Sequence, residues 1–97
     1  MTRKAAKPTD ARSRWTRVAE DHGLDLVFFD PPAIFDAAII GIVYGNGQEP
    51  AVLYDEPRVL AALIDSGMSA EDADDWFHTN TIGVYLGEAT PRFLGWK

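Results

Sequence analysis

The sequence contains no cysteine. This absence excludes disulfide bonds, thiolate nucleophiles and zinc sites built from cysteine, and it suits a reducing cytoplasm. Long apolar runs are also missing, because the longest extends only from Ala37 to Tyr44 and is too short to cross a bilayer. Residues 5–10 are polar where a secretory signal would be apolar. We therefore expect a cytoplasmic protein that does not act at a membrane.

Basic residues are scarce beyond position 17. Residues 18–97 contain three of them (Arg58, Arg92 and Lys97) against fourteen acids, a net charge of −11. Residues 1–17 contain six basic side chains against one acid, a net charge of +5. Binding to a phosphate backbone needs clustered Lys and Arg, so the acidic body is not expected to bind nucleic acid directly. Such a charge balance favours basic partner surfaces instead.

No group of residues has the spacing of a catalytic or metal site. Asp74 and His78 stand four residues apart on a predicted helix and could share a metal ion, but divalent sites need three or more converging ligands. The interpretation we favour is a solvated acidic helix face. No serine stands in a Gly-x-Ser-x-Gly elbow that would pair it with His22 or His78. We therefore predict a non-enzymatic protein with no catalytic, cofactor-binding or metal-binding residues and no cofactor.

The helices are predicted from apolar periodicity and from residues that start or stop them. After a flexible basic tail over residues 1–8, residues 9–97 are expected to form a single domain. Its first helix is capped by Thr9 or Asp10 and stops at Gly23. The apolar stripe of that helix is Ala11, Trp15, Val18 and Ala19, and the three arginines Arg12, Arg14 and Arg17 are expected on its other faces.

Two further helices are predicted to pair. Asp55 caps the first of them, Gly67 stops it, and Ser69 caps the second. The expected inward side chains of the first are Val59, Leu60, Leu63 and Ile64, and those of the second are Ala73, Trp76 and Phe77. Trp15, Trp76 and Phe77 are interpreted as core residues rather than as a platform for stacked bases. The positions of Phe28, Phe29, Phe93 and Trp96 stay open, and Trp96 is a candidate interface anchor.

Strands are predicted over residues 24–29, 37–44, 51–54, 81–86 and 92–94. The second and third of these should form a hairpin, because Asn46-Gly47 between them can adopt the positive φ angles of a tight turn. The sequence therefore predicts an α+β fold: a small, largely antiparallel sheet packed against a helical pair, with an additional N-terminal helix.

From Asp36 onward the chain resembles a family of short proteins carried by bacteriophages, prophages and their hosts. The matching segments are residues 38–43, 51–55, 67–73 and 87–91, together with Trp76-Phe77, Asn80 and Gly83. Residues 82–87 depart from the family's pattern, because relatives have a Trp there, and the basic N-terminal extension is particular to this chain. The resemblance implies the same kind of fold, a phage-linked accessory role and the cytoplasm of a bacterial host. Small acidic phage proteins of this size include anti-CRISPR proteins, which bind and block a nuclease or its targeting complex.

Acidic residues near the junction of the paired helices form the candidate binding surface. One interpretation is a solvated surface that keeps the protein soluble. The other is a negative patch that contacts a host nucleic-acid-handling complex through that complex's basic surface, as an anti-CRISPR-like inhibitor would. The alternative function is a small phage structural or regulatory protein, as a homodimer through a strand edge or Trp96. The predicted partner-binding residues are Asp65, Glu71, Asp72, Asp74 and Asp75.

Overall fold

A computed structural model describes residues 8–45, 47–82, 84 and 86–95 of the chain. The predicted tail thus lies outside the described residues, except for Pro8, which begins the first helix. The elements follow one another along the described residues in this order: α1 (Pro8–His22), α2 (Pro32–Phe35), the 3-10 turn η1 (Asp36–Ala38), β1 (Ile39–Gly45), β2 (Gln48–Asp55), α3 (Glu56–Asp65), α4 (Ala70–Asn80) and β3 (Arg92–Leu94).

The three strands form one sheet with β2 in the centre, in the order β1-β2-β3. β1 and β2 are antiparallel, with Ile42 opposite Val52. β2 and β3 are parallel, with Tyr54 opposite Phe93. The predicted α+β class is confirmed, and the longer of the two strand pairings is the antiparallel one. β3 pairs with the last residues of β2, and α3, α4 and the segment that follows α4 form the connection that a parallel pair requires.

The hairpin between β1 and β2 is confirmed. Gly45 pairs with Gln48, so two residues make the turn. Gly47 has a φ of +74°, which glycine adopts without steric cost. Asn46 lies outside the described residues. β2 begins at Gln48, three residues before the predicted start, because the ladder continues to the turn itself.

The core lies where the sheet, the paired helices and the segment from Phe29 to Ala38 meet. Tyr54 is fully buried and stacks on Phe93 at 5.6 Å between ring centroids. Phe77 of α4 meets Phe93 edge-on at 5.0 Å. The other buried members of this cluster are Phe29, Phe35, Ala38, Ile39, Val52, Val59, Leu63 and Ala73. Ile64 is an exception to the predicted inward face: it is 42% exposed, because the row Val59–Leu63 faces the core and Ile64 stands beside that row at the helix end.

The helix ends follow local chemistry. Gly23 has a φ of +67°, and the Leu24 N–H donates to the Ala19 carbonyl at 2.8 Å, which closes the end of α1 as predicted. The cap predicted at Thr9 or Asp10 is wrong, because α1 already begins at Pro8 and both residues lie in its first turn. Proline suits such a first position, since its missing N–H would have no partner there. The Asp55 and Ser69 caps are confirmed by hydrogen bonds from Arg58 N–H and Asp72 N–H.

Two predicted strands are wrong. Residues 24–29 lie outside the sheet, and the Phe29 N–H donates to the Tyr54 hydroxyl at 2.9 Å, so a side chain takes up this backbone group where a neighbouring strand would. The described residues of 81–86 form no strand either. There the Val84 N–H donates to the Thr81 carbonyl and the Leu86 N–H to the Thr90 hydroxyl, so turns take up these backbone groups. Gly83 and Tyr85 lie outside the described residues.

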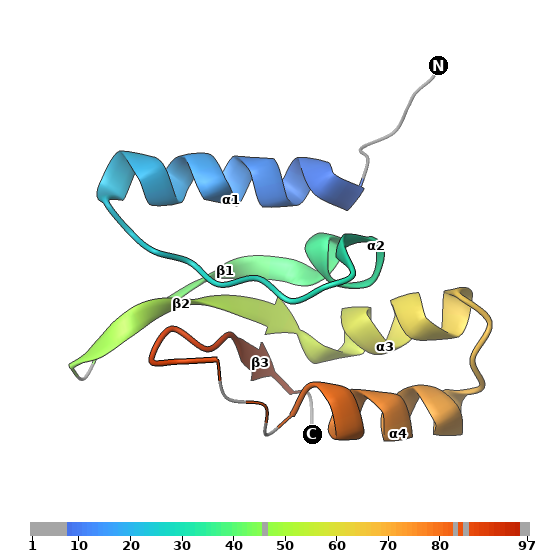
Figure 1. Cartoon of the computed structure of the whole chain (residues 1–97). Coiled ribbons are helices and arrows are strands. Elements are labelled where there is room, and N and C mark those ends of the chain that lie inside the picture. The colour runs from blue at the N-terminus through green and yellow to red at the C-terminus, as the bar shows by residue number, and fades with distance from the viewer. Residues whose placement is uncertain (1–7, 46, 83, 85, 96–97) are drawn as a thin grey trace, which may run out of the picture.

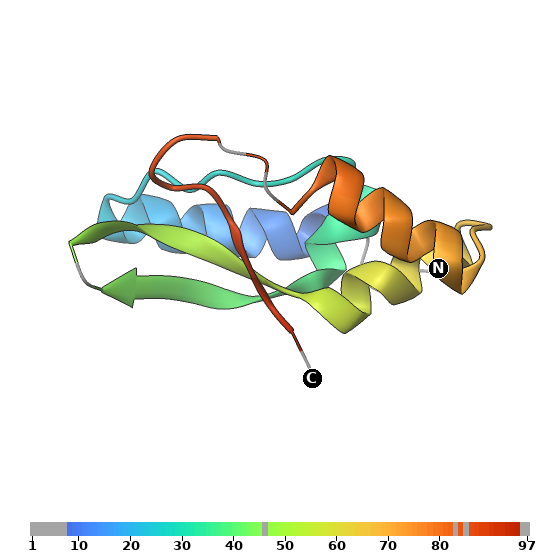
Figure 2. The ribbon, with the colours of Figure 1, turned by 90° about the horizontal axis from the view of Figure 1, so that it is seen from below.

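Figure 1 places α1 and α4 at opposite margins of the ribbon, with the sheet between them. Figure 2 shows β1 along a third margin of the ribbon, which the end of β3 crosses in this view. Within the described part of the chain, no helix combines the length and apolar character needed to traverse a bilayer. The fold therefore presents three distinct surfaces: the outer side of α1, the outer side of α4 and the free edge of β1.

Candidate protein-binding surface

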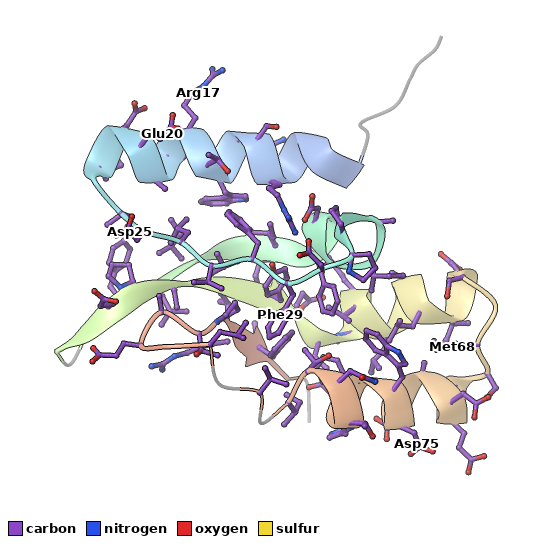
Figure 3. All side chains as sticks on the ribbon, viewed as in Figure 1. Arg17, Glu20, Asp25, Phe29, Met68 and Asp75 are labelled. Atoms are coloured by element: carbon purple, nitrogen blue, oxygen red, sulfur yellow. The ribbon has the colours of Figure 1, made fainter. Side chains whose placement is uncertain are left out.

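The acidic residues of α4 stand on its outer side. Ala73 and Phe77 are fully buried and fix which side of the helix faces the core. The other positions from Ala70 to Asp75 are exposed, and four of them are carboxylates: Glu71, Asp72, Asp74 and Asp75. Figure 3 shows the Asp75 side chain at the margin of the molecule, pointing away from the sheet. The predicted exposure of these four acids is confirmed.

The position of α4 is fixed by a cap and a hydrophobic contact. The Ser69 hydroxyl accepts a hydrogen bond from the Asp72 N–H at 3.0 Å. Met68, just before this cap, packs partly buried against the core. Glu71 and Asp72 also lie in the first turn, where the positive end of the helix dipole stabilises carboxylates. Glu71 and Asp72 thus contribute to the stability of α4 itself.

The acidic surface has little compensating positive charge. The sequence contains six acids and no Lys or Arg between positions 59 and 91. Among the described residues of α4, His78 Nδ1 lies 2.9 Å from the Asp74 carbonyl oxygen and 3.5 Å from Asp74 Oδ1, and this histidine is exposed. The described residues hold no group of three His, Asp or Glu side chains placed to bind a metal ion. The Asp74–His78 pair is therefore an exposed helical contact.

Asp65 lies apart from the other four acids in the chain. It is the last residue of α3 and is exposed. Ser66 to Ser69 then connect α3 to α4, and Gly67 ends α3 with a φ of +120°. The structure therefore brings Glu71, Asp72, Asp74 and Asp75 together on α4 and places Asp65 across the connection from them. We use the name "α4 acidic surface" for those four residues.

The outer side of α1 carries charges of both signs. Arg14 and Arg17 are exposed in its middle, and Glu20 and Asp21 are exposed in its last turn. Figure 3 shows Arg17 and Glu20 at the margin opposite Asp75. Because α1 lies across the molecule from α4, its arginines do not neutralise the α4 acidic surface. His22 is exposed at the end of the helix.

Arg12 does not face solvent, which corrects the prediction made for it. Its side chain is 24% exposed, and it binds three acceptors. The guanidinium donates to Asp36 Oδ1 from Nε at 3.0 Å, to Asp30 Oδ1 from Nη1 at 3.1 Å and to the Phe29 carbonyl from Nη2 at 2.6 Å. It also lies over the Phe28 ring, 5.0 Å from the centroid. The sequence signal was its position three residues before Trp15 and seven before Ala19, on the buried stripe.

Asp36 is the buried acid of this cluster. Its side chain is 0% exposed, and its Oδ2 has no hydrogen-bond partner. Burial raises the pKa of Asp36 above 3.8, while the nearby Arg12 charge and hydrogen bond act in the opposite direction. The folded protein therefore keeps this proton to a higher pH than the unfolded chain does. The contribution of Asp36 to stability accordingly falls as the pH rises above 3.8 through the folded pKa.

The open aromatic positions are resolved in favour of the core. Phe29 is buried, and Phe28 and Phe93 pack against the core partly buried. Trp15 and Trp76 also pack there, as predicted. Trp96, the candidate interface anchor, lies outside the described residues. These rings therefore serve packing, and the described side chains on the outer side of α4 are mainly polar and acidic.

The serines of the paired helices are engaged in backbone contacts. Ser69 is the cap of α4, and the Ser66 hydroxyl donates to the Leu63 carbonyl at 2.6 Å.

The α4 acidic surface is the strongest candidate site on chemical grounds. Comparisons with protein families, with curated proteins and with solved structures find no match to this chain. The resemblance of residues 36–91 to phage-borne proteins stays a prediction.

Proposed function

We propose that the protein is a non-enzymatic, phage-type inhibitor that binds a basic surface of a host nucleic-acid-handling complex. The observation that carries this proposal is the α4 acidic surface: four exposed carboxylates on two turns of one helix, with no Lys or Arg between positions 59 and 91. A groove that normally holds DNA or RNA is lined with cations, and uncompensated carboxylates complement it. Asp65 would extend the same contact from the end of α3.

The proposed mechanism is competition for the groove. The bound protein would occupy positions of the phosphate backbone, and no covalent step is required. Because the attraction acts between surface charges, the affinity should fall steeply as salt is added. Anti-CRISPR proteins that block a nuclease or its targeting complex are the class to which we assign it.

The first test is charge reversal of the α4 acidic surface. The variant Glu71→Lys, Asp72→Lys, Asp74→Lys, Asp75→Lys should no longer be captured by the complexes that the unmodified protein retains from a host lysate. It should also no longer displace DNA or guide RNA from them. A neutral variant with Gln and Asn at the same positions separates loss of binding from helix destabilisation, because lysines oppose the dipole at the start of α4. Circular dichroism checks the folding of each variant.

A matched control reverses four exposed acids elsewhere, at Glu20, Asp21, Asp25 and Glu88. This control changes the net charge of −6 by the same amount while leaving α4 intact. We expect it to keep most of the displacement activity. Equal loss in both variants would mean that only net charge matters, and full activity of the α4 variant would contradict the proposed surface.

A further inference from the structure

The free edge of β1 has features unusual for an exposed strand edge. Along the described residues, β1 pairs with β2 on one side and with no strand on the other. Its seven residues include no charged side chain and no proline. Edge strands are usually protected by Lys or Pro, by bulges or by a covering element, because unpaired N–H and C=O groups template further pairing. Of these devices, the described part of β1 has only the register shifts at its two ends. Among the described elements, Figure 2 shows β1 at the margin of the ribbon, with only the end of β3 crossing it in that view.

Two of the large exposed apolar side chains belong to this strand. Ile40 is 37% exposed and Tyr44 is 64% exposed. The register with β2 shifts on both sides of residues 41–43, so this stretch is the regular centre of β1. An antiparallel partner strand centred on Ile42 would therefore pair with the regular backbone of residues 41–43, and the exposed Ile40 and Tyr44 side chains would flank this pairing on both sides.

From these observations we infer that β1 pairs antiparallel with β1 of a second copy of this chain, about a two-fold axis at Ile42. In that register Ile40 of one copy lies opposite Tyr44 of the other, and the reverse pair forms by symmetry. The most exposed apolar side chains of the strand thereby cover each other as cross-strand pairs. An identical strand fits this uncharged edge, whereas a basic partner would be drawn to the α4 acidic surface.

The dimer is expected to be weak and to depend on salt in a characteristic direction. One strand pair covers only part of the roughly 800 Å² per partner that a standard interface buries, so the dimer should dissociate on dilution. Each copy carries a net charge of −6, so added salt screens the repulsion and strengthens the dimer. Binding to a basic partner weakens with salt instead, which separates this inference from the proposed function.

The test measures molar mass by light scattering over a range of protein concentrations. The unmodified protein should shift from one chain to two as its concentration rises. The variant Ile40→Lys, Tyr44→Lys places lysines opposite each other and should raise the dissociation constant by about tenfold or more. The variant Ile40→Glu, Tyr44→Lys places opposite charges in the same register and should restore much of the affinity.

Leu94→Lys is the matched control. Leu94 is 39% exposed and lies on β3, at the other edge of the same sheet. It should leave the dissociation constant within about twofold, because it lies outside the pairing surface. Circular dichroism confirms that each variant folds. A single chain at every concentration overturns the inference, and so does a dimer that only Leu94→Lys weakens or that the two lysines leave unchanged.

Discussion

Arg12 has a large expected effect on stability. Its guanidinium is the counter-charge of the buried Asp36 carboxylate and also bonds the Phe29 carbonyl. Arg12→Met keeps much of the side-chain volume but leaves Asp36 buried without a cation. Removing one partner of a buried pair costs about 3–5 kcal/mol, so we expect a loss of that order in urea denaturation at neutral pH.

Two further variants make this prediction specific. Arg14→Met, on the exposed side of the same helix, should change the free energy of unfolding by less than about 0.5 kcal/mol. Adding Asp36→Asn to Arg12→Met should recover part of the loss, because the buried charge is then gone. Equal effects of Arg12→Met and Arg14→Met would show that the cluster contributes no more than a surface contact.

Tyr54 makes the free energy of unfolding depend on pH in the alkaline range. Its phenol is buried, and burial raises its pKa from 10.0 to about 12. Between these values the unfolded chain has lost the proton and the folded protein keeps it. Stability therefore falls as the pH rises, by about 2–3 kcal/mol over that window. Denaturation at a series of pH values between 10 and 12 measures this slope.

Tyr54→Phe should remove this contribution to the slope. The same variant should lose about 1–3 kcal/mol at neutral pH, because the Phe29 N–H then lacks its acceptor in the core. The difference in phenolate absorbance between the two proteins should titrate near 12. Tyr44→Phe is the control, since Tyr44 is exposed. An unchanged alkaline slope in Tyr54→Phe would contradict the assignment.

At the scale of elements, α4 depends on its cap. Ser69→Ala removes the acceptor of the Asp72 N–H and should cost about 1 kcal/mol in thermal or urea unfolding. Ser69→Asp should keep the cap and lose much less, because aspartate is an equally good acceptor. Ser13→Ala, at an exposed position inside α1, is the neutral comparison. A loss in Ser69→Asp as large as in Ser69→Ala would point to a role other than capping.

The elements that the sequence predicts well are those whose signals are local. Gly23 and Gly67 end helices by their own backbone conformation, and Asp55 and Ser69 start helices within three residues. The hairpin is local in the same sense. The α4 acids were placed correctly because Ala73 and Phe77 fix the inward side.

The errors share a different cause, which is contact between distant residues. Residues 24–29 have strand-forming side chains, but the Phe29 backbone bonds the side chains of Tyr54 and Arg12, which lie 25 and 17 positions away. Periodicity places Arg12 beside the buried stripe, but its charge predicts exposure to solvent. Only the folded chain brings Asp36 next to it as a partner. The parallel pairing of β3 likewise joins Tyr54 to Phe93, residues far apart in the chain, and no local pattern encodes it.

At the scale of the molecule, the two proposed contacts use different surfaces. The α4 acidic surface lies at one margin and the β1 edge at another, so neither contact needs the residues of the other. Salt acts on them in opposite directions, because one joins unlike charges and the other joins two chains of net charge −6. A titration with salt that measured both contacts would therefore show them diverging.

The unequal division of charge between the two margins also governs how the molecule approaches another body. α4 contains four acids and no arginine or lysine, whereas α1 balances three arginines with three acids. The chain therefore has an electric dipole moment, and the electric field of a positively charged surface exerts a torque on it. That torque begins within a screening length of about 8 Å at physiological ionic strength, before any atoms touch. The torque turns α4 towards the positively charged surface. The charge pattern therefore affects the rate of association more than the lifetime of the complex.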